Sequence, residues 1–306
     1  MEFIRPIQID DAKLVSTTIL EDDYPEWVSG QSYALDEYVI RTQTHRVYRC
    51  SGAVTSSTPP EEDILNWTDY GPTNAWAMFD QDVSTLSDSS AQDEVTVVIS
   101  PGRVDSIALL RLQARTIDVS MNWNGEEVYS AHIDLEEPSN NTGGLFDYFF
   151  EPRVLGSYWY ENELVDLAFL DMTPFISSEI TITFRNPGGL VKVGEFVCGK
   201  KFYIGETQNN PRPGVKNYSV RKRDEKTGKI TLQKGGSTRY LRASARLDTK
   251  DLDSVFSTLE RYKDEPMVIV ATSLHGSMII LGLVDWEMER QNSLITQIEI
   301  TAEGVS

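Results

Sequence analysis

The side chains best suited to chemistry in this sequence are carboxylates, which gather in two short acidic runs. One run covers residues 21–23 (EDD) and the other covers residues 61–63 (EED). Hydrolysis of a glycosidic bond needs two carboxyl groups held at a fixed separation across a groove. Adjacent acids of this kind are more typical of solvated loops, so we expect no catalytic pair from either run.

Sulfur and imidazole ligands are too scattered to predict a zinc centre. The histidines are His45, His132 and His275, and no C-x-x-C or H-E-x-x-H motif is present. Two cysteines, Cys50 and Cys198, lie far apart in the sequence. They could be free thiols or one disulfide, and their placement in separate domains favours free, buried thiols.

Three aspartates near the start of the central region (Asp80, Asp82 and Asp88) are the best candidates for calcium ligands, because calcium prefers oxygen. Their spacing does not match an EF-hand loop, and acidic loop residues are usually solvated. The sequence also lacks a G-x-S-x-G elbow and a G-x-x-x-x-G-K-[ST] loop. We therefore expect no metal, no cofactor and no enzymatic activity.

The charge of the chain excludes some partners and suggests others. A net charge of -19 over 306 residues argues against nucleic acid as the main partner. We expect no signal peptide and no membrane insertion, because no apolar leader and no run of 18 apolar residues occurs. Residues 216–250 carry a net charge of +8 and residues 251–306 carry -7. This asymmetry suggests complementary contacts between subunits, although a solvated hairpin face explains it equally well.

Apolar periodicity predicts a mainly β protein with one clear helix. Residues 249–262 place apolar side chains at helical spacing, with Asp248 as the expected N-cap. Most other segments alternate or form short apolar runs between turn residues. Turn and linker signals divide the chain into residues 1–73, 74–208 and 209–306.

The first region is rich in aromatic residues. After Trp27 come Tyr33, a Val-Tyr-Arg-Cys strand that contains Tyr48, a Pro-Pro pair and a closing Trp67. This pattern resembles the small chitin-binding-like carbohydrate modules of chitinases and phage adhesins, and it covers about a sixth of the chain. The resemblance implies that Tyr33, Tyr48 and Trp67 stack on sugar rings. A domain this small also needs aromatic side chains for its core, so both roles stay open.

The central region is a series of alternating strands. It includes Glu-Ile-Thr-Ile-Thr-Phe at residues 179–184 and a hydrophobic strand with Gly-Glu at residues 194–195. This order resembles the galactose-binding-like jelly roll, a two-sheet antiparallel sandwich. The fold serves sugar binding, calcium binding and structural packing alike, so it implies no single ligand.

The last region is expected to be an α+β module with the one helix and a long hairpin. Strands around Tyr218 and Leu232 are joined through a Thr-Gly-Lys turn at residues 227–229. The cations of this hairpin are predicted to lie at a subunit interface. They are Lys216, Arg221, Lys222, Arg223, Lys226 and Lys229.

Residues 76–80, 214–224 and 248–304 together resemble a family of structural proteins from the tails of bacteriophages. The resemblance implies a virion protein of the tail or baseplate, made in the host cytoplasm and assembled as symmetric copies. Its partners would be other tail proteins and copies of itself. The alternative is a glycan-binding adhesin that recognises a host surface polysaccharide.

Overall fold

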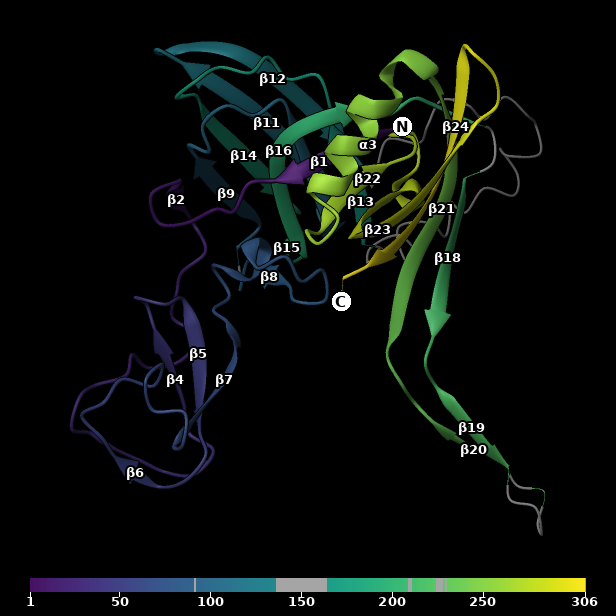
Figure 1. Cartoon of the computed structure of the whole chain (residues 1–306). Coiled ribbons are helices and arrows are strands. Elements are labelled where there is room, and N and C mark those ends of the chain that lie inside the picture. The colour runs from purple at the N-terminus through teal and green to yellow at the C-terminus, as the bar shows by residue number, and fades with distance from the viewer. Residues whose placement is uncertain (91, 136–163, 209–210, 224–227, 229, 306) are drawn as a thin grey trace, which may run out of the picture.

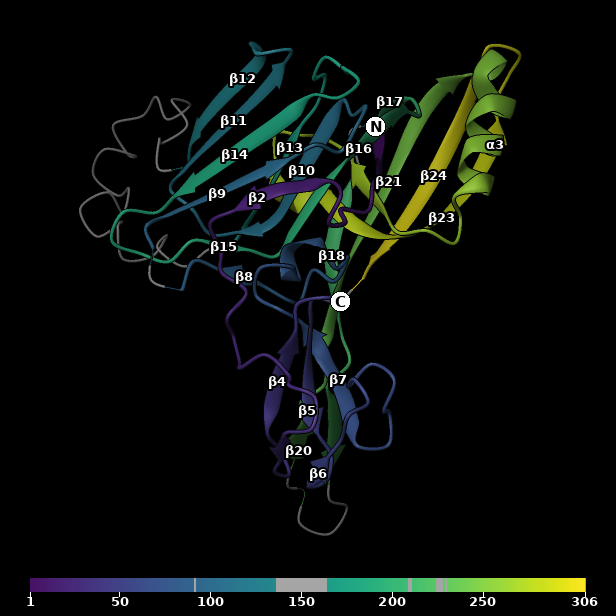
Figure 2. The same ribbon diagram turned by 90° about the vertical axis from the view of Figure 1, so that its left-hand side faces the viewer.

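The computed structural model describes residues 1–90, 92–135, 164–208, 211–223, 228 and 230–305 (Figure 1). The predicted mainly β fold is confirmed, and α3 (Leu252–Arg261) is the only α-helix among the described residues. Figures 1 and 2 show a body of packed sheets from which two parts extend at the same end, a small module and a long hairpin.

A ten-stranded antiparallel sheet runs through the whole body. Its order is β13 (Val165–Phe169), β10 (Ser106–Leu112), β16 (Glu195–Tyr203), β1 (Glu2–Pro6), β22 (Met267–Val270), β23 (Ile279–Arg290), β24 (Ile295–Gly304), β21 (Ser237–Asp248) and β17 (Glu206–Thr207), with β18 (Arg212–Asn217) also paired to β21.

The N-terminal strand joins the central and C-terminal regions into this one sheet. β1 pairs with β16 on one side and with β22 on the other, so Phe3 lies between Phe202 and Ile269. The predicted boundaries at residues 73 and 208 remain predictions. A continuous hydrogen-bonded ladder nevertheless crosses from the second region to the third.

A second, five-stranded sheet completes a sandwich with one half of the large sheet. Its order is β12 (Glu126–Asp134), β11 (Thr116–Trp123), β14 (Glu179–Arg185), β9 (Glu94–Ile99) and β2 (Leu14–Thr17). Alternation places Val95, Val97 and Ile99 on the inner face, where they pack with Ile107 and Leu109 of the large sheet. This two-sheet sandwich is the architecture expected for the central region.

The large sheet curls until β13 approaches β21. The buried carboxylate of Asp166 in β13 accepts the Arg111 backbone N–H at 2.7 Å and forms an ion pair with Arg239 of β21. The 3₁₀ turn η4 (Gly276–Met278) lies against β13 and β18. A side chain at Gly276 would come within 2.7 Å of the Asp166 carbonyl oxygen, so this close approach needs glycine.

The predicted helix packs on one face of the β21–β24 half of the sheet (Figure 2). A 3₁₀ turn, η3 (Thr249–Asp251), precedes α3, so the α-helix itself begins at Leu252. Leu259 is buried on the sheet, and Val255 and Tyr262 pack beside it. The prediction of Asp248 as a capping residue is corrected in part. It precedes η3, but its side chain forms no capping hydrogen bond and pairs with Lys250 instead.

The predicted long hairpin is present. β18 pairs with β21 along the edge of the body, and beyond that edge β19 (Val220–Arg223) pairs with β20 (Ile230–Gln233). These last two strands form a separate two-stranded sheet that extends away from the body (Figure 1).

The small module lies at the end of the segment that follows β2. It contains a three-stranded sheet in the order β4 (Tyr38–Arg41), β5 (Arg46–Cys50) and β7 (Trp67–Pro72), and the short pair β3 (Ser32–Tyr33) and β6 (Val54–Thr55). The chain then re-enters the body through η1 (Ala77–Phe79) and the small sheet of β8 (Ser87–Asp88) and β15 (Lys192–Val193).

Candidate functional site

The three aromatic residues predicted to stack on sugars lie together, but inside the small module. Tyr33, Tyr48 and Trp67 are only 4%, 6% and 2% exposed. Tyr33 and Trp67 meet edge to face with ring centroids 5.1 Å apart. The Tyr33 hydroxyl accepts the Val28 backbone N–H at 2.7 Å. Of the two roles left open by the sequence, the structure places these side chains in the core.

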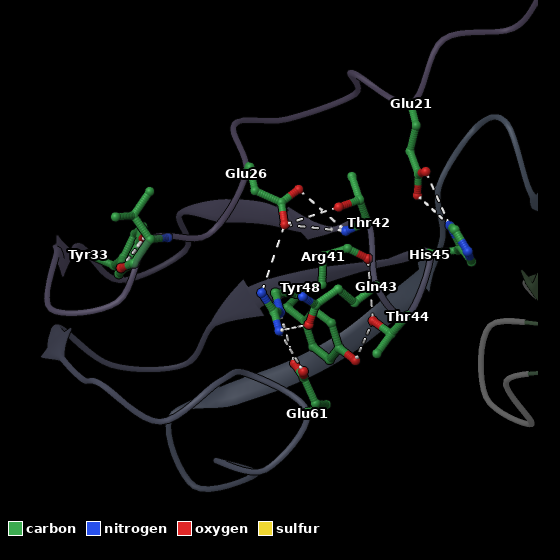
Figure 3. Close-up of polar contacts among 11 residues, drawn as sticks. Glu21, Glu26, Tyr33, Arg41, Thr42, Gln43, Thr44, His45, Tyr48 and Glu61 are labelled. Atoms are coloured by element: carbon green, nitrogen blue, oxygen red, sulfur yellow. Dashed lines mark hydrogen bonds and ion pairs between the residues drawn. The ribbon is translucent and has the colours of Figure 1, made fainter.

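A buried arginine, Arg41, links several polar side chains of the small module (Figure 3). The Arg41 guanidinium donates to both oxygens of Glu61, at 2.9 and 3.2 Å, and to Gln43 at 2.8 Å. The guanidinium carbon of Arg41 lies over the Trp27 ring, 5.1 Å from its centroid, and Arg41 Nη1 lies 3.8 Å from Glu26 Oε1. Hydrogen bonding from Arg41 lowers the pKa of Glu61. This carboxylate therefore fastens a loop, and it lacks the raised pKa that a general acid needs.

The other acidic run also supports the local structure. Both ring nitrogens of His45 contact carboxylates, with Nδ1 3.1 Å from Glu21 and Nε2 2.9 Å from Asp11. Glu21 also accepts the Thr73 hydroxyl at 2.9 Å. The His45 ring lies flat on Trp76 of the body at 3.9 Å. These contacts form the junction between the small module and the body.

The opposite face of the module's sheet carries three tyrosines in contact, which we call the tyrosine cluster: Tyr24, Tyr38 and Tyr70. Tyr24 stacks on Tyr38 with centroids 5.1 Å apart and planes at 21°, and Tyr70 meets Tyr38 edge to face at 5.0 Å. Tyr70 is 62% exposed and Tyr24 is 38% exposed, while Tyr38 between them is half-buried. The cluster thus presents aromatic surface to solvent.

Sequence reasoning missed this cluster, although part of the signal was available. Tyr38 directly precedes the core residue Val39, so alternation along β4 places it on the opposite face. Tyr70 lies at an irregularity in the pairing of β5 with β7, between Asp69 and Gly71. Its exposure depends on that irregularity, which the residue pattern does not reveal.

Polar groups border the tyrosine cluster. Arg49 is the cross-strand neighbour of Tyr38 and lies 3.6 Å from the Asp36 carboxylate, with both side chains largely exposed. Thr68 is the neighbour of Arg49 on β7, and its hydroxyl is 2.8 Å from that of Ser51. Aromatic surface beside a few convergent polar groups is the usual composition of a small-ligand site. Such a site suits a sugar, which offers both C–H faces and hydroxyl groups.

Four of the six cations predicted at a subunit interface lie on the described part of the hairpin. Lys216 is on β18, where it pairs with Glu303 at 2.5 Å. Arg221, Lys222 and Arg223 occupy β19 and are exposed. Lys226 and Lys229 lie outside the described residues. Whether these side chains contact another subunit remains a prediction.

Glu195 is a buried carboxyl group with no ion-pair partner among the described residues. Glu195 of β16 is 1% exposed, and its Oε2 atom has no hydrogen-bond partner. Burial, reinforced by the neighbouring charge of Asp80, raises the pKa of Glu195 to about 10, so the group is protonated and neutral at pH 7. Burial also raises the pKa of Asp80.

No three metal-ligating side chains gather among the described residues in a way that could hold an ion. Of the three aspartates considered as calcium ligands, Asp80 and Asp82 lie near Glu195, whereas Asp88 accepts the Ser90 backbone N–H from its place in β8. Cys50 and Cys198 are buried free thiols, as favoured by the sequence. Within the described part of the chain, no helix has the length and apolar character needed to span a bilayer.

Of the comparisons with known proteins, the one with solved structures gave matches. No protein-family model matches the sequence. No curated protein matches it. The chain is similar to a solved structure described as "CpGH89CBM32-6 produced by Clostridium perfringens", with 12% identity and a TM-score of 0.25 over 40% of this chain and 81% of the other. A likeness this weak supports no argument about function. The resemblance to phage tail proteins finds no support here and remains a prediction.

Proposed function

We propose that this protein is a non-catalytic glycan-binding protein and that its small module carries the sugar site. The observation behind the proposal is the tyrosine cluster, which leaves aromatic rings exposed on the outer face of a small sheet. Sugar rings present apolar C–H surfaces that pack against such rings. Tyr70 is the principal stacking surface because it is the most exposed of the three.

The polar groups that border the cluster would fix the orientation of a bound sugar. Arg49 donates hydrogen bonds and Asp36 accepts them, so together they match the hydroxyl groups of a saccharide. Their ion pair is exposed and weak, so either group can exchange its partner for a ligand at little cost. The proposal therefore moves sugar binding from Tyr33, Tyr48 and Trp67 to Tyr24, Tyr38 and Tyr70.

Binding of the full chain to a glycan array tests this function. The parent protein is expected to bind a subset of surface polysaccharides, and Tyr70→Ala should lose that binding by about tenfold or more. Tyr203→Ala is a matched control, because Tyr203 on β16 is 61% exposed and lies outside the cluster. Absence of binding by the parent, or equal losses in both variants, would overturn the proposal.

A second candidate function is a structural role in a phage tail or baseplate. The observation that favours it is the isolated hairpin, whose exposed apolar and cationic side chains extend beyond the body. Under this proposal, the protein occurs in symmetric stoichiometry in purified virions, as measured by quantitative mass spectrometry. Its absence from virions would exclude this role without affecting the glycan proposal.

A further inference from the structure

The outer part of the hairpin, formed by β19 and β20, presents one face of mixed cationic and apolar character. The register pairs Arg221 with Leu232 and Arg223 with Ile230, so all four side chains lie on the same face. Ile230 is 65% exposed and Leu232 is 53% exposed. We call these four residues the ribbon face. Among the described residues, neither arginine forms an ion pair.

The ribbon face is short of packing partners. β19 and β20 pair only with each other, and no described element covers them. A two-stranded sheet alone is marginally stable in water. Leu232 and Ile230 thus lie exposed beside guanidinium groups that have no ion-pair partner among the described residues, a combination that suits an acidic and partly apolar partner surface.

The same chain carries a surface of that description. On the sheet face opposite α3, β23 exposes Asp285, Glu287 and Glu289 in alternate positions, preceded by Leu283, which is 48% exposed. β24 adds Glu299 directly opposite Glu287. We call this set of five residues the acidic face. Like charges placed opposite each other are destabilising, and none of the four carboxylates has an ion-pair partner among the described residues.

The two faces match in spacing as well as in charge. Both are built on β-strands, where alternate side chains are separated by roughly 6.8 Å. Arg221 and Arg223, like Glu287 and Glu289, therefore follow the spacing common to alternate residues of β-strands. Each face also offers aliphatic surface beside the charges, which gives an interface an apolar component that charge alone does not supply.

A contact inside one chain already joins the two surfaces at their margins. Lys216 Nζ and the Tyr218 hydroxyl, at the base of the hairpin, contact the two carboxylate oxygens of Glu303 near the end of β24 at 2.5 and 2.9 Å. Beyond this point the hairpin runs away from β23 and β24 (Figure 1). Arg221 and Arg223 are thus carried away from the acidic face of their own chain.

We propose that the ribbon face of one copy docks on the acidic face of a second copy. Each copy then offers both halves of a head-to-tail interface, which closes into a ring or extends as a filament according to the rotation between neighbours. The pairing supplies counter-charge to the four carboxylates, of which Glu287 and Glu299 lie directly opposite each other, and covers Ile230 and Leu232. This inference does not rest on the glycan-binding proposal, because the tyrosine cluster takes no part in it.

Charge reversal with rescue tests the proposal in the full chain. Arg221→Glu/Arg223→Glu reverses the ribbon face, and Glu287→Arg/Glu289→Arg reverses the acidic face. In sedimentation velocity, the parent chain is expected to self-associate, more weakly at high ionic strength. Each variant alone should associate about a hundredfold more weakly. An equimolar mixture of the two should associate again, since each reversed face then meets a complementary one.

Matched controls use exposed charges elsewhere. Arg103→Glu/Lys263→Glu and Glu126→Arg/Glu127→Arg make the same changes of charge away from both faces and should leave self-association unchanged. Unchanged circular dichroism and melting show that the variants are folded. As a second measurement, Leu232→Cys mixed with Glu287→Cys should give a disulfide-linked dimer under oxidising conditions.

Three outcomes overturn the proposal. They are a parent chain that stays monomeric at every concentration, equal effects of test and control substitutions, and loss in both variants without rescue in the mixture. If the ribbon face instead serves a polyanion, the parent retards nucleic acid in gel shifts or binds anionic vesicles. Arg221→Glu/Arg223→Glu alone then abolishes that binding, and Glu287→Arg/Glu289→Arg has no effect on it.

Discussion

His45 lies flat against Trp76, with ring centroids 3.9 Å apart and planes at 21°. His45 belongs to the turn between β4 and β5 of the small module, whereas Trp76 packs against the core of the sandwich. Both ring nitrogens of His45 also contact carboxylates, Nδ1 that of Glu21 and Nε2 that of Asp11. The stacking of His45 on Trp76 therefore helps to hold the small module against the body.

Replacing Trp76 by alanine is expected to loosen that junction. The substitution removes the surface on which His45 stacks and should cost about 2 kcal/mol of stability, because Trp76 is only partly buried. Small-angle scattering should show a larger radius of gyration as the module samples more orientations. Trp123→Ala, at an exposed site of β11, should leave the scattering unchanged. Identical curves for both variants would contradict this role of Trp76.

Core and surface aromatics of the module should separate stability from binding. Trp67→Ala empties a core position and is expected to cost about 3–5 kcal/mol, which unfolds much of a small module. Tyr70→Ala should change the free energy of unfolding by less than about 1 kcal/mol while it removes glycan binding. Urea denaturation followed by tryptophan fluorescence measures the free energy of unfolding of both variants, and the glycan array measures their binding. A Tyr70→Ala protein as unstable as Trp67→Ala would make Tyr70 a core residue and remove the proposed site.

Glu195 should make the protein less stable as the pH rises. In the folded protein its pKa is about 10, against an ordinary value of 4.5, so folding takes up a proton between these values. The stability that proton uptake by Glu195 contributes is fully present below pH 4.5 and is lost as the pH approaches 10. The free energy of unfolding should fall by up to about 1.4 kcal/mol per pH unit within this window.

The variant Glu195→Gln should remove that part of the slope, because an amide does not titrate. Denaturation of both proteins across the window measures the difference, and equal slopes would show that Glu195 is ionised in the fold. Melting with calcium and with a chelator checks which species neutralises the carboxylate. If a proton neutralises Glu195, calcium should not change the melting temperature of the parent protein. A calcium-dependent rise in melting temperature that Glu195→Gln abolishes would instead identify a bound cation.

The pair of Asp166 and Arg239 should contribute strongly to closure of the curled sheet. Arg239→Ala leaves the buried Asp166 carboxylate without its counter-charge and is expected to cost about 1–3 kcal/mol, because Arg239 itself is 40% exposed. Lys216→Ala removes an exposed pair with Glu303 and should have little measurable effect on stability. Hydrogen exchange should locate the damage from Arg239→Ala in β13 and β21. Equal melting of the two variants would show that the pair of Asp166 and Arg239 does not hold the sheet closed.

Local patterns predicted the elements that repeat regularly. Alternation identified the sandwich strands, helical spacing identified the segment of α3, and the Thr-Gly-Lys motif predicted a hairpin in the segment where β19 pairs with β20. The path of the large sheet could not be predicted in the same way. Insertion of β1 between β16 and β22 joins residues about 200 and 265 positions apart, and no local periodicity encodes such a pairing.

The sequence by itself determined a mainly β chain, the aromatic side chains of the first region, and the opposite net charges of residues 216–250 and 251–306. Tertiary structure decided which of them face solvent. It buried Tyr33, Tyr48 and Trp67 and exposed Tyr24 and Tyr70, because strand alternation and an irregularity in β7 send neighbouring aromatics to opposite faces. Tertiary structure also separated the ribbon face from the acidic face. The acidic face lies on the large sheet, whereas the hairpin continues beyond the edge of that sheet as the separate pair β19 and β20.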